Sequence, residues 1–197
     1  MDDLFPDSRL SQGLGFDAAP LLWPLFFALY PKDEDLPHVV SWQRCLCHRY
    51  QPALYLRSPE LLHVSVEEWG MRGRRRQPLR DAIALAEQYF AYPSFEIAFA
   101  AIASFGAGGQ ALVAIADGAG SRSVDGLRIA LADAQRYAGI EARRGHKQAH
   151  LTLGYSNKLS VESGAIEPFG FKVAAVDLVL SNRGHGEHMH LTRWLLH

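Results

Sequence analysis

The stretch LLHVSVEEWG (residues 61–70) decides the fold, because its alternation of apolar and polar residues is typical of a strand with one buried face. The apolar side chains on one face of that strand are Leu62, Val64 and Val66. His63 and Ser65 fall on the opposite face and therefore point the same way. We predict a strand here that presents an imidazole and a hydroxyl together.

A second stretch, QAHLTLGYSN (residues 148–157), has the same form, with His150 two residues before Thr152. Two histidines that face one cleft could share the opening of a phosphodiester, one as base and the other as acid, because an imidazole titrates near pH ~6.5. A hydroxyl two residues along each strand could donate to the phosphate oxygens. The sequence shows no pair of carboxylates with the spacing of a metal site, so we expect neither a metal nor another cofactor.

The pattern alone is weak evidence, because a third copy stands at His190 and Thr192 in HMHLTRW. The first two copies each follow a predicted helix and adjoin a loop rich in Arg or Lys, whereas the third lies on a terminal strand. We therefore expect the third copy not to be catalytic. The histidines of GHGEHMH (residues 184–190) lack partners for a four-ligand metal site, and we expect a turn with solvated histidines.

Alternation and helical spacing predict the remaining elements. Strands are expected at residues 24–31, 60–69, 95–106, 111–118, 148–155, 170–182 and 188–197. Helices are expected at residues 32–51, 77–93 and 123–140. This order favours an α+β fold over a doubly wound parallel sheet. Residues 1–21 show no sustained periodicity, so we expect a flexible extension there and one domain at residues 22–197.

The composition limits the partners and the compartment. The chain has 197 residues, of which 48% are hydrophobic and 21% charged, which is enough for one sizeable core. Its 20 Lys and Arg nearly balance its 21 Asp and Glu, so no whole-molecule field attracts nucleic acid. Both cysteines lie in RCLCHRY (residues 44–50), and no secretory signal or membrane span is recognisable. We expect a cytoplasmic monomer.

Local features could still attract RNA. The basic clusters RGRRR (residues 72–76) and EARRGHK (residues 141–147) adjoin the two motif strands and could bind a phosphate backbone, although a solvated loop face is the alternative. Trp69 and Tyr155 stand just beyond the two motifs. Either ring could stack on a base beside the phosphate, although burial in a core is the commoner fate of an aromatic side chain.

The motifs HVSV (residues 63–66) and HLTL (residues 150–153) resemble the HxTx and HxSx signatures of the 2H phosphoesterase superfamily. The resemblance is strongest to its RNA 2',3'-cyclic phosphodiesterase branch, often labelled 2'-5' RNA ligase. LFFALYP (residues 25–31), PSFEIAFAAIASFG (residues 93–106) and the closing segments VDLVLSN and HLTRWLL are similar to strands of that branch, in the same order. The resemblance covers roughly residues 24–196.

This resemblance implies a bilobal α+β fold in which two antiparallel sheets form a central cleft, with helices on the outer faces. It implies that His63 gives a proton to the leaving 3' oxygen and that His150 activates water. Ser65 and Thr152 would hold the cyclic phosphate. The product would be a 2'-phosphate at an RNA end, formed without metal or nucleotide cofactor.

Two departures from the family pattern keep other functions open. Ser65 stands where this branch usually has Thr, which keeps the hydroxyl. Tyr155 stands two residues beyond the second motif, where members often have an Arg that can contact phosphate. The alternatives are a noncatalytic module that binds an RNA end or a nucleotide, a small-molecule cyclic phosphodiesterase, and a 2'-5' RNA ligase.

Overall fold

The computed structural model describes residues 24–50, 55–69, 76–106, 110–142, 148–156, 161–182 and 187–197. The expected N-terminal extension and most residues of the two basic clusters lie outside these ranges. Within them, no helix is both long enough and apolar enough to cross a membrane.

The described residues form the α+β fold that the order of elements predicts. The strands are β1 Leu25–Leu29, β2 Tyr55–Leu56, β3 Val64–Glu68, β4 Phe95–Phe105, β5 Ala111–Ala116, β6 His150–Tyr155, β7 Gly164–Val173, β8 Ala175–Asn182 and β9 Glu187–Leu195. The helices are α2 Leu36–Tyr50, α3 Arg76–Gln88 and α4 Gly118–Tyr137, with a short 3-10 helix at Pro59–Leu61.

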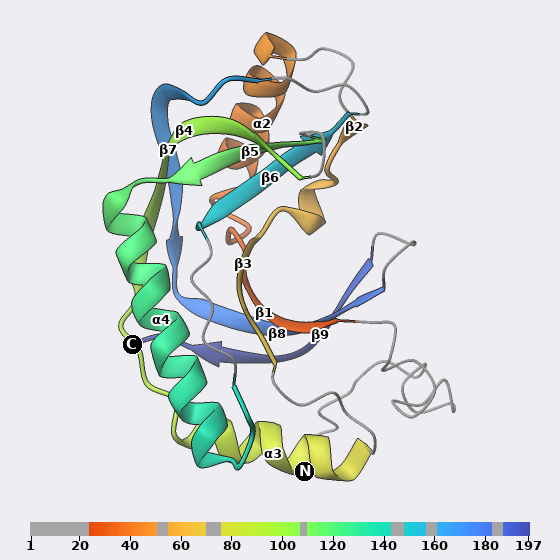
Figure 1. Ribbon diagram of the computed structural model, residues 1–197, viewed down its shortest axis with the longest axis vertical. Helices are drawn as coiled ribbons and strands as arrows, with labels where there is room; N and C mark the ends of the chain where they lie inside the picture. The colour runs from red at the N-terminus through yellow and green to blue at the C-terminus, as the bar shows by residue number, and fades with distance from the viewer. Residues whose placement is uncertain are drawn as a thin grey trace.

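The strands pair antiparallel throughout the described ranges, in the order β7-β4-β5-β6-β3-β1-β8-β9, and β2 also pairs with β6. Two halves, β7-β4-β5-β6 and β3-β1-β8-β9, diverge from the place where they meet (Figure 1). Among the described residues, β3 and β6 pair only through Val64 and Leu151. The two expected sheets are therefore the halves of one continuous sheet, joined only by the short pairing of β3 with β6. We call this junction the waist.

The helices lie outside this bent sheet (Figure 1). α4 packs on β4 and β3, and α2 packs on β7 and β6. α4 begins earlier than predicted, because Asp117 is its N-cap and accepts a hydrogen bond from the Gly120 N–H at 2.6 Å. Ser123 therefore lies inside the helix. Gly139, with φ 74°, ends the helix as expected, since glycine adopts a positive φ without strain.

The predicted strand at residues 170–182 is wrong in one respect, because the chain forms two strands there. β7 ends at Val173 at one edge of the sheet, and β8 begins at Ala175 in the other half. The two strands read as one in the sequence because both are apolar. The two-residue strand β2, which pairs Tyr55 with Tyr155, was not predicted.

An aromatic cluster forms the core beneath β1. The Phe27 ring lies 5.0 Å from Trp194 and 5.7 Å from Trp69, between ring centroids, and Phe90 lies 5.2 Å from Trp194. Trp69 is only 4% exposed. The expectation that Trp69 stacks on a base is therefore wrong, because its ring is enclosed by the core.

Gly154 on β6 allows β2 to approach closely. A Cβ at this position would lie 2.8 Å from the carbonyl oxygen of Tyr55. We predict that Gly154→Ala lowers the free energy of unfolding by about 1–3 kcal/mol, because the backbone of β2 must move. Gly164→Ala is the matched control, since a Cβ there meets only the Glu162 carbonyl, at 4.0 Å. Urea denaturation compares the two, and equal losses would contradict the close packing of β2.

Candidate active site

The waist of the sheet brings the two motifs together. Because β3 and β6 pair antiparallel through the residues that follow the two histidines, the register continued by one residue sets His63 opposite Thr152 and His150 opposite Ser65. The charge of His150 makes a small contribution to the lowered pKa of His63, after burial and the charges of Arg57 and His188. The two motif strands therefore pair through Val64 and Leu151.

The alternation predicted from the sequence is confirmed on both strands. Val64 and Val66 on β3 are buried, whereas Ser65 between them is exposed. On β6, Leu151 and Leu153 are fully buried, while Thr152 between them and His150 before them are only partly covered. Burial of the apolar face therefore directs the histidines and hydroxyls to the other face.

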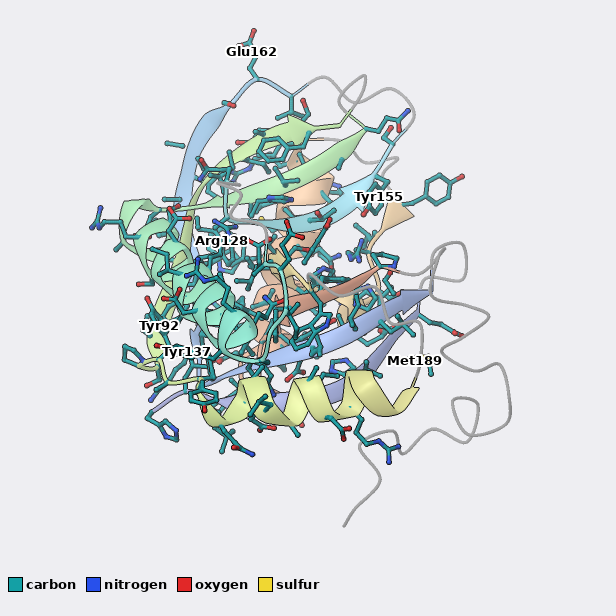
Figure 2. All side chains as sticks on the ribbon, turned by 60° about the horizontal axis from the view of Figure 1, so that its bottom comes forward. Tyr92, Arg128, Tyr137, Tyr155, Glu162 and Met189 are labelled. Atoms are coloured by element: carbon teal, nitrogen blue, oxygen red, sulfur yellow. The ribbon has the colours of Figure 1, made fainter. Side chains whose placement is uncertain are left out.

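Each motif strand carries a bulge directly after its hydroxyl residue. The register between β1 and β3 skips Val66, and the register between β5 and β6 skips Leu153. Buried polar side chains satisfy the two bulge carbonyls. Arg128 of α4 donates from Nε to Val66 O at 2.7 Å, and Gln43 of α2 donates from Nε2 to Leu153 O at 2.7 Å. Figure 2 shows Arg128 between α4 and the sheet.

Both imidazoles are held in the same way. His63 donates from Nδ1 to the carbonyl of Leu61 at 2.7 Å, and His150 donates from Nδ1 to the carbonyl of Gln148 at 2.8 Å. A carbonyl can only accept, so each neutral ring carries its proton on Nδ1 and keeps a lone pair on Nε2. Ser65 Oγ lies 3.2 Å from Nε2 of His63 and can donate to it.

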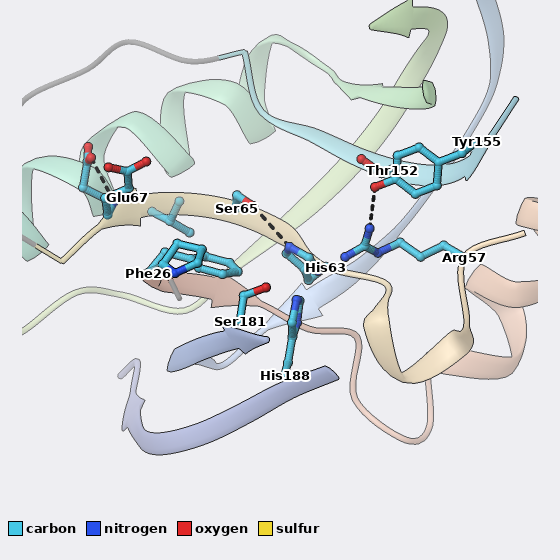
Figure 3. A pocket seen from close by; sticks show the side chains of 12 residues that line it. Phe26, Arg57, His63, Ser65, Glu67, Thr152, Tyr155, Ser181 and His188 are labelled. Atoms are coloured by element: carbon cyan, nitrogen blue, oxygen red, sulfur yellow. Dashed lines mark hydrogen bonds between the residues drawn. The ribbon is translucent and has the colours of Figure 1, made fainter. Parts of the chain in front are cut away.

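A cavity of about 280 Å³ opens beside the waist (Figure 3). Its lining consists of Pro24, Phe26, Arg57, His63, Ser65, Val66, Glu67, Glu68, Thr152, Tyr155, Ser181 and His188. The expected site residues His63, Ser65, Thr152 and Tyr155 are thus brought together. His150 is not part of this lining, and its ring packs 4.9 Å from that of Phe105, between centroids.

Two lining residues were missed in the sequence. Arg57, just after β2, donates from Nη1 to Tyr155 Oη at 2.6 Å and from Nε to Leu61 O at 2.8 Å. His188, on β9, lies with its ring 4.8 Å from that of His63. No spacing signal marks Arg57. His188 was expected in a solvated turn, but the hairpin of β8 and β9 carries it into the cleft.

Tyr30 fixes the proton of His188. Its hydroxyl lies 2.6 Å from His188 Nδ1. Burial, together with the nearby carboxylate of Asp177, raises the pKa of Tyr30, so the phenol stays protonated and donates. A neutral His188 therefore holds its own proton on Nε2, where it can donate.

His63 and His188 in the cavity, and His150 beside it, have lowered pKa values and are neutral near pH 7. Burial, followed by the positive charge of Arg57, lowers the pKa of His63 to about 3. The same two causes lower the pKa of His188 to about 4. Burial is also the main cause of the lowered pKa of His150, with a further contribution from Arg128.

The third His-x-Thr copy has a different environment. His190 does not line the cavity, and its Nδ1 lies 2.8 Å from Asp177 Oδ2. Arg193 binds both oxygens of the same carboxylate. Burial would raise the pKa of Asp177, but the hydrogen bonds from Arg193 and His190 hold it below its ordinary value. In the described part of the chain, no three His, Cys, Asp or Glu side chains converge as metal ligands.

Neither a protein-family model nor a curated protein sequence matches the chain. Solved structures do match. A phosphoesterase is 18% identical with a TM-score of 0.66, over 88% of this chain and 98% of that chain. LigT of Escherichia coli in complex with phosphate is 16% identical with a TM-score of 0.63, over 88% and 97% of the two chains. The fold is that of LigT.

A third structure agrees with this result. The protein TT0787 of Thermus thermophilus is 19% identical with a TM-score of 0.62, over 87% of this chain and 97% of that chain. Because these matches span nearly the whole length of each neighbour, the LigT-like fold that the sequence resemblance implied is confirmed. In this fold the two motif strands lie side by side at the waist.

The buried neutral histidines predict how stability depends on pH. The pKa of His63 is lower in the folded chain than in the unfolded chain, so the unfolded chain binds the extra proton as the pH falls below 6.5. Between pH 7 and pH 5, His63 should therefore cost the folded state about 1–2 kcal/mol.

Urea denaturation at the two pH values tests this expectation. The loss of stability should be smaller in His63→Gln than in the unmodified protein, while His48→Gln, at an exposed position of α2, should leave it unchanged. An equal loss in the unmodified protein and in His63→Gln would contradict the burial of a neutral imidazole.

Proposed function

We propose that the protein hydrolyses 2',3'-cyclic phosphates at RNA ends to 2'-phosphates by paired-histidine acid-base catalysis. The observation that carries the proposal is the matched anchoring of His63 and His150 through Nδ1, which leaves the lone pair on Nε2 of each ring for proton transfer, with Ser65 Oγ 3.2 Å from that of His63. Two such imidazoles can handle both proton transfers of the reaction, so no metal is required.

In the proposed reaction, Nε2 of His150 takes a proton from a water molecule, whose oxygen forms a bond to phosphorus. The bond from phosphorus to O3' breaks, and His63 gives a proton to O3'. Ser65 and Thr152 donate to the non-bridging oxygens, because a hydroxyl can rotate toward an acceptor. The attacking water leaves its hydroxyl on phosphorus and its proton on His150, and the proton of His63 ends on O3'; proton exchange with solvent then returns both imidazoles to their starting states.

His63 needs a proton before it can act as the acid. In the free protein, burial and Arg57 keep the pKa of this imidazole low, so the ring is neutral. A bound phosphate monoanion would stabilise the imidazolium and raise that pKa. Binding of the substrate would therefore let His63 take up a proton from solvent and become the acid.

The likeness to LigT supports a ligand with a phosphate group. LigT structures exist in complex with phosphate, 3'-AMP, ATP and NADP+. The cavity of about 280 Å³ lies near the lower end of ligand pockets, which hold roughly 300–1,000 Å³. That volume suits a ribose with its cyclic phosphate, with the rest of an RNA chain lying outside. The 43% exposed ring of Tyr155 stands at the rim, where a base could stack.

The small cavity also favours a second candidate, a phosphodiesterase for free 2',3'-cyclic nucleotides. The proton transfers would be the same for both substrates. Only the binding energy that the RNA chain adds outside the cavity would differ. Comparison of kcat/KM for a cyclic mononucleotide and for an RNA that ends in a 2',3'-cyclic phosphate separates the two. A higher value for RNA supports the RNA end as substrate.

We predict that His63→Ala and His150→Ala each lower kcat on these substrates by about 10²–10⁴-fold, the range of a lost general acid or base. Initial rates measured in EDTA, with the product identified by phosphorus NMR, check this expectation. His48→Ala, on the exposed face of α2, should retain the full rate. Turnover that survives both substitutions in the cleft would sink the mechanism, and loss of turnover on chelation would indicate a metal enzyme.

A further inference from the structure

The cavity has a positive end and a negative end. Among the residues that line it in the described ranges, Arg57 is the only Arg or Lys, and the carboxylates are those of Glu67 and Glu68. Figure 3 shows Glu67 on one side of His63 and Arg57 on the other. A phosphate anion would therefore settle toward Arg57, where Thr152 also lies.

The guanidinium of Arg57 is held rigidly. Nη1 donates to Tyr155 Oη at 2.6 Å, and Nε donates to Leu61 O at 2.8 Å. The guanidinium carbon also lies 5.9 Å from the centre of the Tyr155 ring. Figure 3 shows the guanidinium extending from the Tyr155 side toward His63. Because its rotamer is fixed before any ligand arrives, binding costs little side-chain entropy.

The backbone of Arg57 is fixed as well. Its N–H donates to Leu153 O at 3.0 Å, and its carbonyl accepts from Gln43 Nε2 at 2.7 Å. Gln43 is only 2% exposed and donates to Leu153 O at the same time. The buried amide thus ties Arg57 to the bulge that follows Thr152 in β6. Arg57 and the second motif form one rigid unit.

We propose that Arg57 is the cation that holds the phosphate in this cleft, and that Tyr155 is a positioning residue that braces it. The position two residues beyond the second motif, where family members often carry an Arg, holds Tyr155 here. In this chain the positive charge is that of Arg57, which follows β2 and lies six residues before His63. Because β2 pairs with the end of β6, the guanidinium lies beside Tyr155. The inference deepens the proposed function and rests on it for the identity of the ligand as a cyclic phosphate.

This assignment gives Arg57 two effects in the cleft. It attracts the anion, and it adds to burial, which is the main cause, in lowering the pKa of His63 and His188. A bound phosphate would offset the guanidinium charge at His63 and let the ring take up its proton. Arg57→Gln should therefore raise the pKa of both imidazoles in the free protein.

Binding of inorganic phosphate, measured by calorimetry, tests the first effect without turnover. We expect Arg57→Gln to weaken binding by roughly 10–100-fold, the usual weight of a charge-assisted hydrogen bond. Arg57→Lys should fall in between, because an ammonium keeps the charge but lacks the planar fork. Arg44→Gln, at an exposed position of α2, is the matched control and should bind phosphate like the unmodified protein.

A charge-relocation variant provides the second test. Tyr155→Arg placed on the Arg57→Gln background should recover much of the phosphate affinity, since it returns a guanidinium to the same strand end. Proton NMR titration of His63 should show the raised pKa in Arg57→Gln and not in Arg44→Gln. Thermal unfolding checks that every variant is folded.

The inference is overturned if folded Arg57→Gln binds phosphate as tightly as Arg44→Gln, or if the titration of His63 is the same in both. These outcomes are distinct from a failure of the proposed function. If the unmodified protein opens no cyclic phosphate but Arg57→Gln still loses phosphate affinity, the function fails and the anion site stands. If turnover is normal in Arg57→Gln and phosphate affinity is unchanged, the function stands and the anion site fails.

Discussion

The site depends on the short antiparallel pairing between β3 and β6 at Val64 and Leu151. These two side chains are fully buried, so their neighbours on either strand must face the cleft. The pairing therefore places His63 opposite Thr152 and His150 opposite Ser65, next to the cavity that His63, Ser65 and Thr152 line. A slip of one residue in either strand would bury a histidine and expose the apolar side chains, which makes the register costly to change.

The rest of the structure stabilises this narrow contact. Each motif strand has a bulge at the residue that follows its hydroxyl residue. A buried side chain from a neighbouring helix donates a hydrogen bond to the carbonyl of each bulge. Arg128 donates to Val66, and Gln43 donates to Leu153. An unsatisfied buried carbonyl would cost about 1–3 kcal/mol. The helices thus act on the site through hydrogen bonds to its backbone as well as through apolar packing, and Gln43 also holds the connection that carries Arg57.

Local pattern was enough to predict the motif strands, the helices and the faces of His63 and His150, because alternation and helical spacing are set by neighbouring residues. Features that depend on distant contacts were not predictable. Trp69 follows its motif and could have stacked on a base, but its ring packs on Phe27. His188 was expected to be solvated, but its ring packs against that of His63. Arg57 carries no motif, since its role arises only when β2 pairs with the end of β6.

In the proposed mechanism, the two motifs form one active site and act on a single phosphate. The double variant His63→Ala with His150→Ala, compared with each single variant in the rate of opening of a 2',3'-cyclic-phosphate RNA, tests it most directly. Residues that act as a unit lose their effect together. We expect the double variant to be about as slow as the slower single variant. Losses that multiply would contradict it, because the two imidazoles would then act independently.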